Sequence, residues 1–169
     1  MAEKVRAAGD SGATDRRRRR GAFDRVGVQA LCFAAMAARD AACHCGQLRL
    51  EVEGDPFAVS ICNCRACQRR TGSAFGVQAW YSRDQVQPAE GTVKRYARVA
   101  ESGRTVKFGF CPECGGTVFW EAEMRPDLIA VAVGTFADPN FEKPSLSGWE
   151  RRQQPWTKAI DAQKIEHSQ

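Results

Sequence analysis

The chain has 169 residues, an apolar fraction of 43% and a charged fraction of 27%, which are typical of a soluble globular protein of one domain. No run of about 18 or more apolar residues is present, which argues against a membrane-spanning helix. The net charge of +5 is uneven, because residues 1–35 hold eight basic and four acidic side chains, and the other 134 residues hold 17 and 16. The nearly neutral remainder argues against a nucleic-acid-binding domain in this part of the chain.

Residues 1–38 form a basic extension with five consecutive arginines at positions 16–20. Such a composition cannot bury enough apolar surface to offset the entropy of ordering, so we expect it to be disordered. Translation that starts at Met36 would remove most of it, and otherwise it could serve as a docking arm for nucleic acid or anionic surfaces. Residues 26–38 only loosely resemble a signal peptide, because Gln29 interrupts a weakly apolar segment. A reducing cytoplasm is therefore the expected compartment.

The rest of the chain, residues 39–165, is predicted to be one mainly β domain. Residues 47–53 alternate apolar and polar side chains, as a half-buried strand does. One helical turn is expected at residues 64–70, ended by Thr71 and Gly72. Many short strands separated by turns are typical of an all-β or β-dominated domain. The further predicted strands are residues 57–61, 75–81, 93–97, 105–110, 117–121 and 128–133.

Seven of the eight cysteines fall into clusters of two, three and two: Cys43 and Cys45; Cys62, Cys64 and Cys67; Cys111 and Cys114. A structural zinc site takes four protein ligands, whereas a catalytic zinc site takes three and keeps one position open. Two pairs together make a closed site, and the middle three make an open one. The clusters therefore predict two zinc ions with different roles.

Other uses of these cysteines are less consistent with the sequence. A spacing of one residue, as in Cys43 and Cys45, suits disulfide geometry poorly. A thioredoxin-like redox pair at Cys111 and Cys114 would need a helix to start there, whereas residues 117–120 continue as a strand. His44 is expected to face away from the metal if its two cysteine neighbours face it.

The three-cysteine cluster has positively charged neighbours. Arg65, Arg69 and Arg70 follow or interrupt it, and they could attract a substrate that carries a carboxylate. An equally plausible interpretation is a solvated surface, because exposed charges contribute little. A zinc ion held by three thiolates suits a soft fourth ligand such as a substrate thiol.

These motifs resemble the glutathione-dependent formaldehyde-activating enzyme family, whose domain is shared with centromere protein V. The resemblance covers roughly residues 41–161 and rests on segments in a fixed order. They are CHCG at 43–46, CNCRAC at 62–67, TGSAF at 71–75, FCPECG at 110–115, DLIAVAVGTFAD at 127–138, and the pairs Trp149-Glu150 and Pro155-Trp156.

The resemblance implies a zinc-bound fold of short, coiled antiparallel sheets. It also implies a structural zinc at Cys43, Cys45, Cys111 and Cys114, and a catalytic zinc at Cys62, Cys64 and Cys67. The implied activity is that of a carbon–sulfur lyase resembling S-(hydroxymethyl)glutathione synthase, with glutathione as co-substrate and formaldehyde or another small carbonyl as its partner. The alternative is a non-catalytic zinc scaffold of the same fold with the basic tail as a docking arm. A membrane partner is not expected.

Overall fold

The structure is a computed structural model, and it describes residues 38–157 and 163–165. The predicted disorder of the basic extension and the alternative start at Met36 therefore lie outside the described residues. Within the described part, no helix is long and apolar enough to cross a membrane.

Strands dominate the described residues, with one short α-helix, α1 (Arg65–Thr71), and four 3₁₀ helices between them. The 3₁₀ helices are η1 (Arg83–Gln85), η2 (Val133–Phe136), η3 (Glu150–Arg152) and η4 (Pro155–Thr157). The strands are β1 (Ala38–Ala42), β2 (Arg49–Glu53), β3 (Ala58–Cys62), β4 (Gly76–Ser82), β5 (Lys94–Val99), β6 (Thr105–Phe110), β7 (Thr117–Ala122), β8 (Leu128–Ala132), β9 (Leu146–Gly148) and β10 (Gln163–Ile165).

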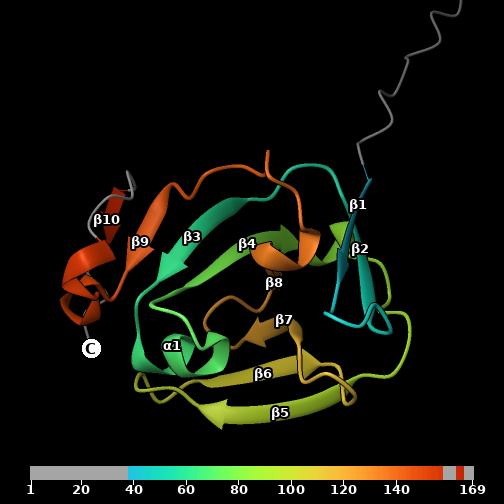
Figure 1. The fold of residues 1–169 in the computed structure, drawn as a ribbon, viewed down its shortest axis with the longest axis horizontal. Coiled ribbons are helices and arrows are strands. Elements are labelled where there is room, and N and C mark those ends of the chain that lie inside the picture. The colour runs from blue at the N-terminus through green and yellow to red at the C-terminus, as the bar shows by residue number, and fades with distance from the viewer. Residues whose placement is uncertain (1–37, 158–162, 166–169) are drawn as a thin grey trace, which may run out of the picture. The chain divides into compact units, whose positions relative to one another are not determined.

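Two sheets make up the fold (Figure 1). β1 and β2 form an antiparallel pair, and the other eight strands form one sheet in the order β10-β9-β3-β4-β8-β7-β6-β5. Neighbours in the large sheet are antiparallel from β3 to β5, whereas β9 runs parallel to both β3 and β10. The sheet is not closed, since β5 and β10 are both edge strands.

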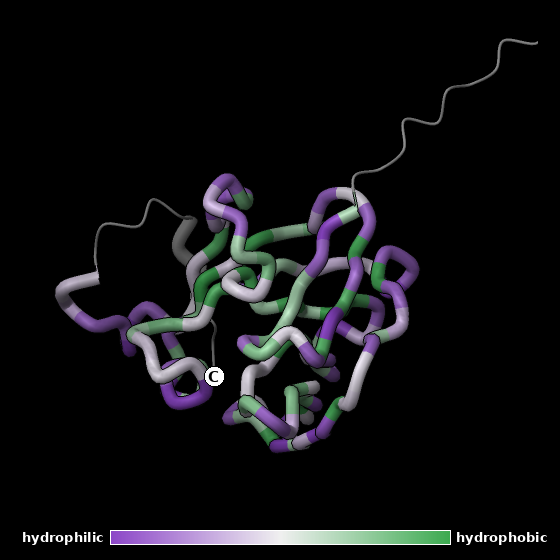
Figure 2. The backbone as a smooth tube through the Cα atoms, turned by 45° about the vertical axis from the view of Figure 1, so that its right-hand side comes forward, coloured by the Kyte–Doolittle hydropathy of each residue, from purple (hydrophilic) through white to green (hydrophobic). Residues whose placement is uncertain are grey.

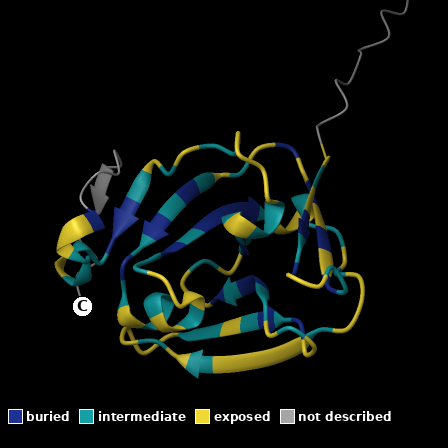
Figure 3. Ribbon diagram, in the orientation of Figure 1, coloured by how far each residue is buried: buried dark blue, intermediate teal, exposed yellow. Residues whose placement is uncertain are grey.

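The main core lies between the β1–β2 pair and one face of the large sheet. Leu50 and Val52 of β2 are buried there with Ala79 and Tyr81 of β4 and Val131 of β8. In Figure 3, dark blue buried segments lie in the central strands, while the edge strand β5 is largely yellow. In Figure 2, much of the peripheral tube is purple, so hydrophilic residues are frequent at the periphery. The apolar alternation of the strands therefore places one set of side chains in this core.

The opposite face of the large sheet carries a second, smaller apolar cluster. It contains Trp80 of β4, Trp120 and Ala122 of β7 and Ala130 of β8. Strand register aligns Trp80 with Ala130, Ala130 with Trp120, and Trp120 with Phe108 of β6. These residues form one cross-strand row, which makes an apolar floor on the face away from β1 and β2.

The prediction of a mainly β fold is confirmed. Strand β6 has the predicted bounds, and the other predicted strands differ by one or two residues at one end or at both ends. The predicted helical turn is α1, which ends at Gly72 in the left-handed conformation (φ 63°). β1, β9 and β10 were not predicted, because three to five residues with little alternation give too weak a pattern.

Candidate metal centres

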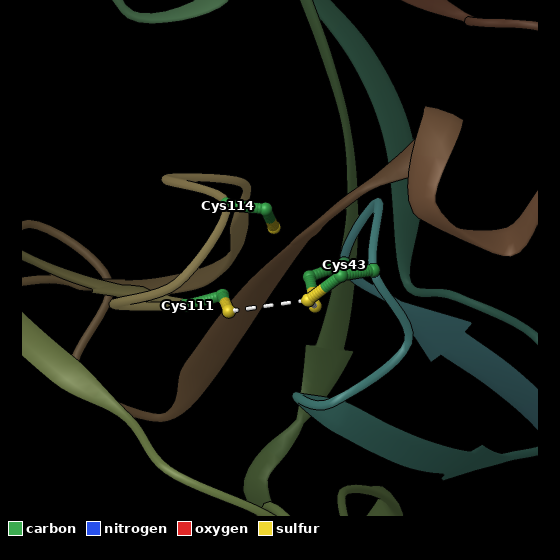
Figure 4. Close-up of side chains that lie close together, drawn as sticks. Cys43, Cys111 and Cys114 are labelled. Atoms are coloured by element: carbon green, nitrogen blue, oxygen red, sulfur yellow. Dashed lines mark hydrogen bonds between the residues drawn. The ribbon is translucent and has the colours of Figure 1, made fainter.

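Four cysteines from distant parts of the chain meet where the β1–β2 connection approaches the β6–β7 connection. Cys43 and Cys45 come from the first connection, and Cys111 and Cys114 come from the second. Their sulfur atoms all lie within 4.8 Å of one another. Figure 4 shows the labelled side chains of Cys43, Cys111 and Cys114 pointing toward one another across the gap. The structure thus brings the two outer cysteine pairs of the sequence together.

The spacing of these sulfurs suits a metal ion. The Sγ–Sγ distance is 3.6 Å between Cys43 and Cys45 and 3.7 Å between Cys45 and Cys111. A disulfide would need about 2.05 Å, and the described cysteines are all free. Four sulfurs placed about 2.3 Å from a tetrahedral zinc ion lie about 3.8 Å from one another. The cluster therefore has the dimensions of a four-thiolate zinc site.

Tight turns direct the sulfurs of each pair to the same place. The backbone N–H of Gly46 donates to the Cys43 carbonyl at 2.9 Å, and that of Gly115 donates to the Cys111 carbonyl at 3.0 Å. Both glycines have positive φ, 76° and 73°, which other residues rarely adopt. The Gln47 side chain also donates to Cys111 Sγ at 3.2 Å, joining the two connections. Sequence reasoning missed Gln47, because a glutamine in a strand pattern gives no sign of a sulfur partner.

His44 lies between the first two cysteines but does not join them. Its side chain is exposed, and the ligand atoms of the cluster are the four sulfurs. This placement agrees with the expectation that His44 faces away.

The second cluster is formed by three cysteines at the junction of β3 and α1. Cys62 is the last residue of β3, Cys64 caps the N-terminus of α1, and Cys67 lies in its first turn. The three sulfurs lie within 4.8 Å of one another, and among the described residues no histidine or carboxylate joins them. The Cys67 N–H donates to Cys64 Sγ at 3.3 Å, which helps to fix the turn. Three convergent thiols can hold a metal ion and leave one side of it without a described protein ligand.

The three thiols differ in their pKa values. Hydrogen bonding by Cys62, and then by Cys67, lowers the pKa of Cys64 to about 2. The contact with Cys64 raises the pKa of Cys62. The cluster therefore favours a thiolate, the form of cysteine that binds metals.

Asn63 anchors the segment between the first two of these cysteines. Its side chain is fully buried, and its amide donates to Gly148 O at 3.0 Å and to Ser147 Oγ at 3.3 Å in β9. Its backbone N–H also donates to Gly148 O at 3.0 Å. Since successive side chains of extended backbone point to opposite sides, burial of Asn63 turns Cys62 and Cys64 away from β9.

Gln68 holds α1 in place from the other end of the cluster. Its side-chain amide donates to Asn63 O at 2.7 Å and to Arg152 O in η3 at 2.9 Å. Sequence reasoning did not identify Asn63 or Gln68. The available signal for Asn63 was a small polar residue between two closely spaced cysteines, whose side chain has to point away from them.

A cleft of about 1120 Å³ opens beside the three-cysteine cluster. Cys62, Cys64 and Cys67 all line it, and the cross-strand aromatic row lies in its wall. The predicted arginines also line it. Arg65 and Arg69 are exposed, and Arg70 is half-buried with its guanidinium 4.3 Å from the Trp120 ring centre. The three-cysteine cluster therefore has access to a space large enough for a small-molecule ligand.

Comparisons with known proteins identify a family. Among solved structures, a crystal structure of a Rhodobacter sphaeroides protein is 22% identical to this chain, with a TM-score of 0.48, and the match covers 60% of this chain and 90% of that one. No curated protein matches. The sequence model of the family described as "Glutathione-dependent formaldehyde-activating enzyme" matches residues 38–152. That range contains both cysteine clusters and well over half of the sequence, and the chain therefore belongs to the glutathione-dependent formaldehyde-activating enzyme family.

Proposed function

We propose that the protein is a zinc-dependent carbon–sulfur lyase that acts on the adduct of a thiol such as glutathione with formaldehyde or another small carbonyl. One observation carries the proposal: three cysteines converge at a cleft and line it, whereas the four others converge on one another and none of them lines it. Family membership supports the same type of reaction. The proposal assigns a catalytic zinc to Cys62, Cys64 and Cys67, and a structural zinc to the other four.

The reaction needs no external oxidant or reductant. In the direction of condensation, the thiol sulfur forms a bond to the carbonyl carbon, and the thiol proton ends on the carbonyl oxygen. In the opposite direction the carbon–sulfur bond breaks and the proton returns to sulfur. A zinc ion in the three-cysteine cluster would supply a ligand position at which a substrate thiol has a lowered pKa.

The residues of the chain would fix the geometry of this reaction. Asn63 and Gln68 hold the backbone that carries the three thiols, so the site is organised before the substrate binds. Trp80 and Trp120 form one wall of the cleft, with the guanidinium groups of Arg125 and Arg70 over their rings. Thiolates must stay reduced to bind zinc, and the proposal therefore includes a reducing, cytoplasmic compartment.

A pair of matched substitutions tests the proposal. Cys64→Ser removes one thiolate at the cleft, and we expect loss of lyase turnover with one zinc ion retained and the fold preserved. Cys114→Ser removes one thiolate from the four-cysteine cluster, and we expect loss of the fold, measured by circular dichroism. Zinc content of the wild-type protein should be two ions per chain.

Turnover that survives in a folded Cys64→Ser protein would refute the open-zinc mechanism. A wild-type protein with two zinc ions and no turnover of any thiol adduct would instead favour the non-catalytic scaffold. The two results differ, because the first keeps the activity and the second lacks it altogether.

A further inference from the structure

The cleft concentrates the positive charge of an otherwise nearly neutral domain. Residues 38–157 hold 15 basic and 14 acidic side chains. Eight of these basic residues line the cleft, and Glu101 is the single acidic residue that the described part of the chain contributes to its wall. Three lie on α1, three on β5, one in the β5–β6 connection and one in the β7–β8 connection. Segments far apart in the sequence thus combine into a strongly basic site.

Most of this charge is not neutralised by the protein. Arg95 pairs with Glu121 at 3.4 Å, and Glu101 pairs with Arg152, which is outside the cleft lining. Among residues 38–157, none of the other seven basic side chains of the cleft forms an ion pair with a carboxylate. Three cysteine thiolates could balance at most three positive charges, so a large excess remains for a ligand.

Two of the cations are fixed on the aromatic floor. Arg70 stacks over Trp120 at 4.3 Å and approaches Phe108 at 5.9 Å, and Arg125 lies over Trp80 at 5.3 Å. Stacking orients a guanidinium group and reduces the entropy that it loses on binding a ligand. Arg70 also has two buried nitrogens, Nε and Nη2, without a hydrogen-bond partner. The floor therefore presents oriented cations whose charge is incompletely satisfied.

We infer that the cleft binds a polyanionic extension of the thiol substrate, with several phosphate or carboxylate groups, beyond the net single negative charge of glutathione. The inference rests on the proposed function, since it places the thiol end of the ligand at Cys62, Cys64 and Cys67. The anionic end lies toward β5 and the β5–β6 connection, where Arg98 and Arg104 line the cleft. Single-stranded nucleic acid fits less well, because Arg70 and Arg125 already cover the indole faces on which bases would stack.

Coenzyme A and pantetheine provide a direct test, because they share a thiol arm and only coenzyme A carries phosphates. Binding to the zinc-loaded full chain is measured by isothermal titration calorimetry, with glutathione as a third ligand. We expect coenzyme A to bind at least about ten-fold more tightly than pantetheine or glutathione. We also expect this difference in dissociation constant to become smaller at high salt. Equal dissociation constants for coenzyme A and pantetheine would overturn the inference. A thymidine oligonucleotide that binds more tightly than coenzyme A would also overturn it.

Matched variants locate the site. Arg98→Gln and Arg104→Gln should each weaken coenzyme A binding about three- to ten-fold and leave pantetheine binding unchanged. Lys107→Gln is the control, because Lys107 is exposed on the neighbouring strand β6 and does not line the cleft. Equal losses in the Lys107 variant would contradict the assignment to this cleft.

The two proposals can fail separately. Tight coenzyme A binding without any lyase turnover would refute the proposed function and keep the polyanion site. Turnover of the glutathione adduct, with no preference for coenzyme A in binding, would support the proposed function and refute the polyanion site.

Discussion

Replacement of Asn63 by alanine should weaken the proposed metal binding by the three-cysteine cluster without changing any of the three cysteines. Asn63 is fully buried, and the change removes side-chain hydrogen bonds of 3.0 Å and 3.3 Å to Gly148 and Ser147. Each such hydrogen bond contributes about 1 kcal/mol to stability, and the small cavity adds to the loss. We therefore expect the free energy of unfolding to fall by about 2–3 kcal/mol. Substitution of residues that support metal ligands in this way typically lowers metal affinity by about 10- to 100-fold.

Zinc release to a chromophoric chelator should show this effect at one site only. The ion held by Cys62, Cys64 and Cys67 should leave the Asn63→Ala protein at a chelator concentration about 10- to 100-fold lower, while the other ion is retained as in the wild type. Ser147→Ala is the milder control, since it removes only the acceptor at 3.3 Å. Unchanged release of both ions, with a free energy of unfolding within about 0.5 kcal/mol of wild type, would refute the anchoring role of Asn63.

Three further predictions concern stability. Gly109→Ala should lower the free energy of unfolding by about 1–3 kcal/mol in urea denaturation, because an added Cβ would lie 2.5 Å from the Phe119 ring; an unchanged midpoint would show that the ring can move. Glu142→Gln should cost about 1 kcal/mol near neutral pH, since Arg39 donates two hydrogen bonds of 2.6 and 2.7 Å to this half-exposed carboxylate. The hydrogen bonds from Arg39 lower the pKa of Glu142 below 4.5, so the stabilisation by this ion pair is complete above that pH. The difference in free energy of unfolding between wild type and variant should disappear as the pH falls through the folded-state pKa of Glu142. A difference that stays constant with pH would contradict this. Complete zinc removal should unfold the domain, as measured by far-ultraviolet circular dichroism, because structural zinc contributes about 10 kcal/mol or more; an unchanged spectrum would contradict a structural zinc.

Local patterns predicted much of the fold. Strand β2 shows why, because Leu50 and Val52 are buried and Arg49, Glu51 and Glu53 are exposed, as the alternation indicates. The end of α1 followed from Gly72, which adopts the left-handed conformation that glycine favours. The cysteine groups also follow from local spacing, whereas their assignment to structural and catalytic zinc is still a proposal.

Other features depend on contacts between distant segments and could not be predicted. Strand β9 has three residues and is defined by parallel pairing with β3, about 85 positions earlier in the chain, as in the pair Cys62 and Gly148. The basic cleft was only partly predicted, for the same reason. The sequence placed Arg65, Arg69 and Arg70 beside the three-cysteine cluster, but Arg98 and Arg125 lie far from Arg70 along the chain, and only the fold brings them into the same cleft.

The two faces of the large sheet have a consequence for how the protein can diverge. Along β4, Ala79 and Tyr81 belong to the main core, whereas Gln78 and Trp80 line the cleft. Substitutions at one set of alternating positions can therefore alter ligand preference, while the other set preserves the scaffold. Members of such a family could acquire new substrates through changes confined to every second residue of a strand, with both cysteine clusters kept intact.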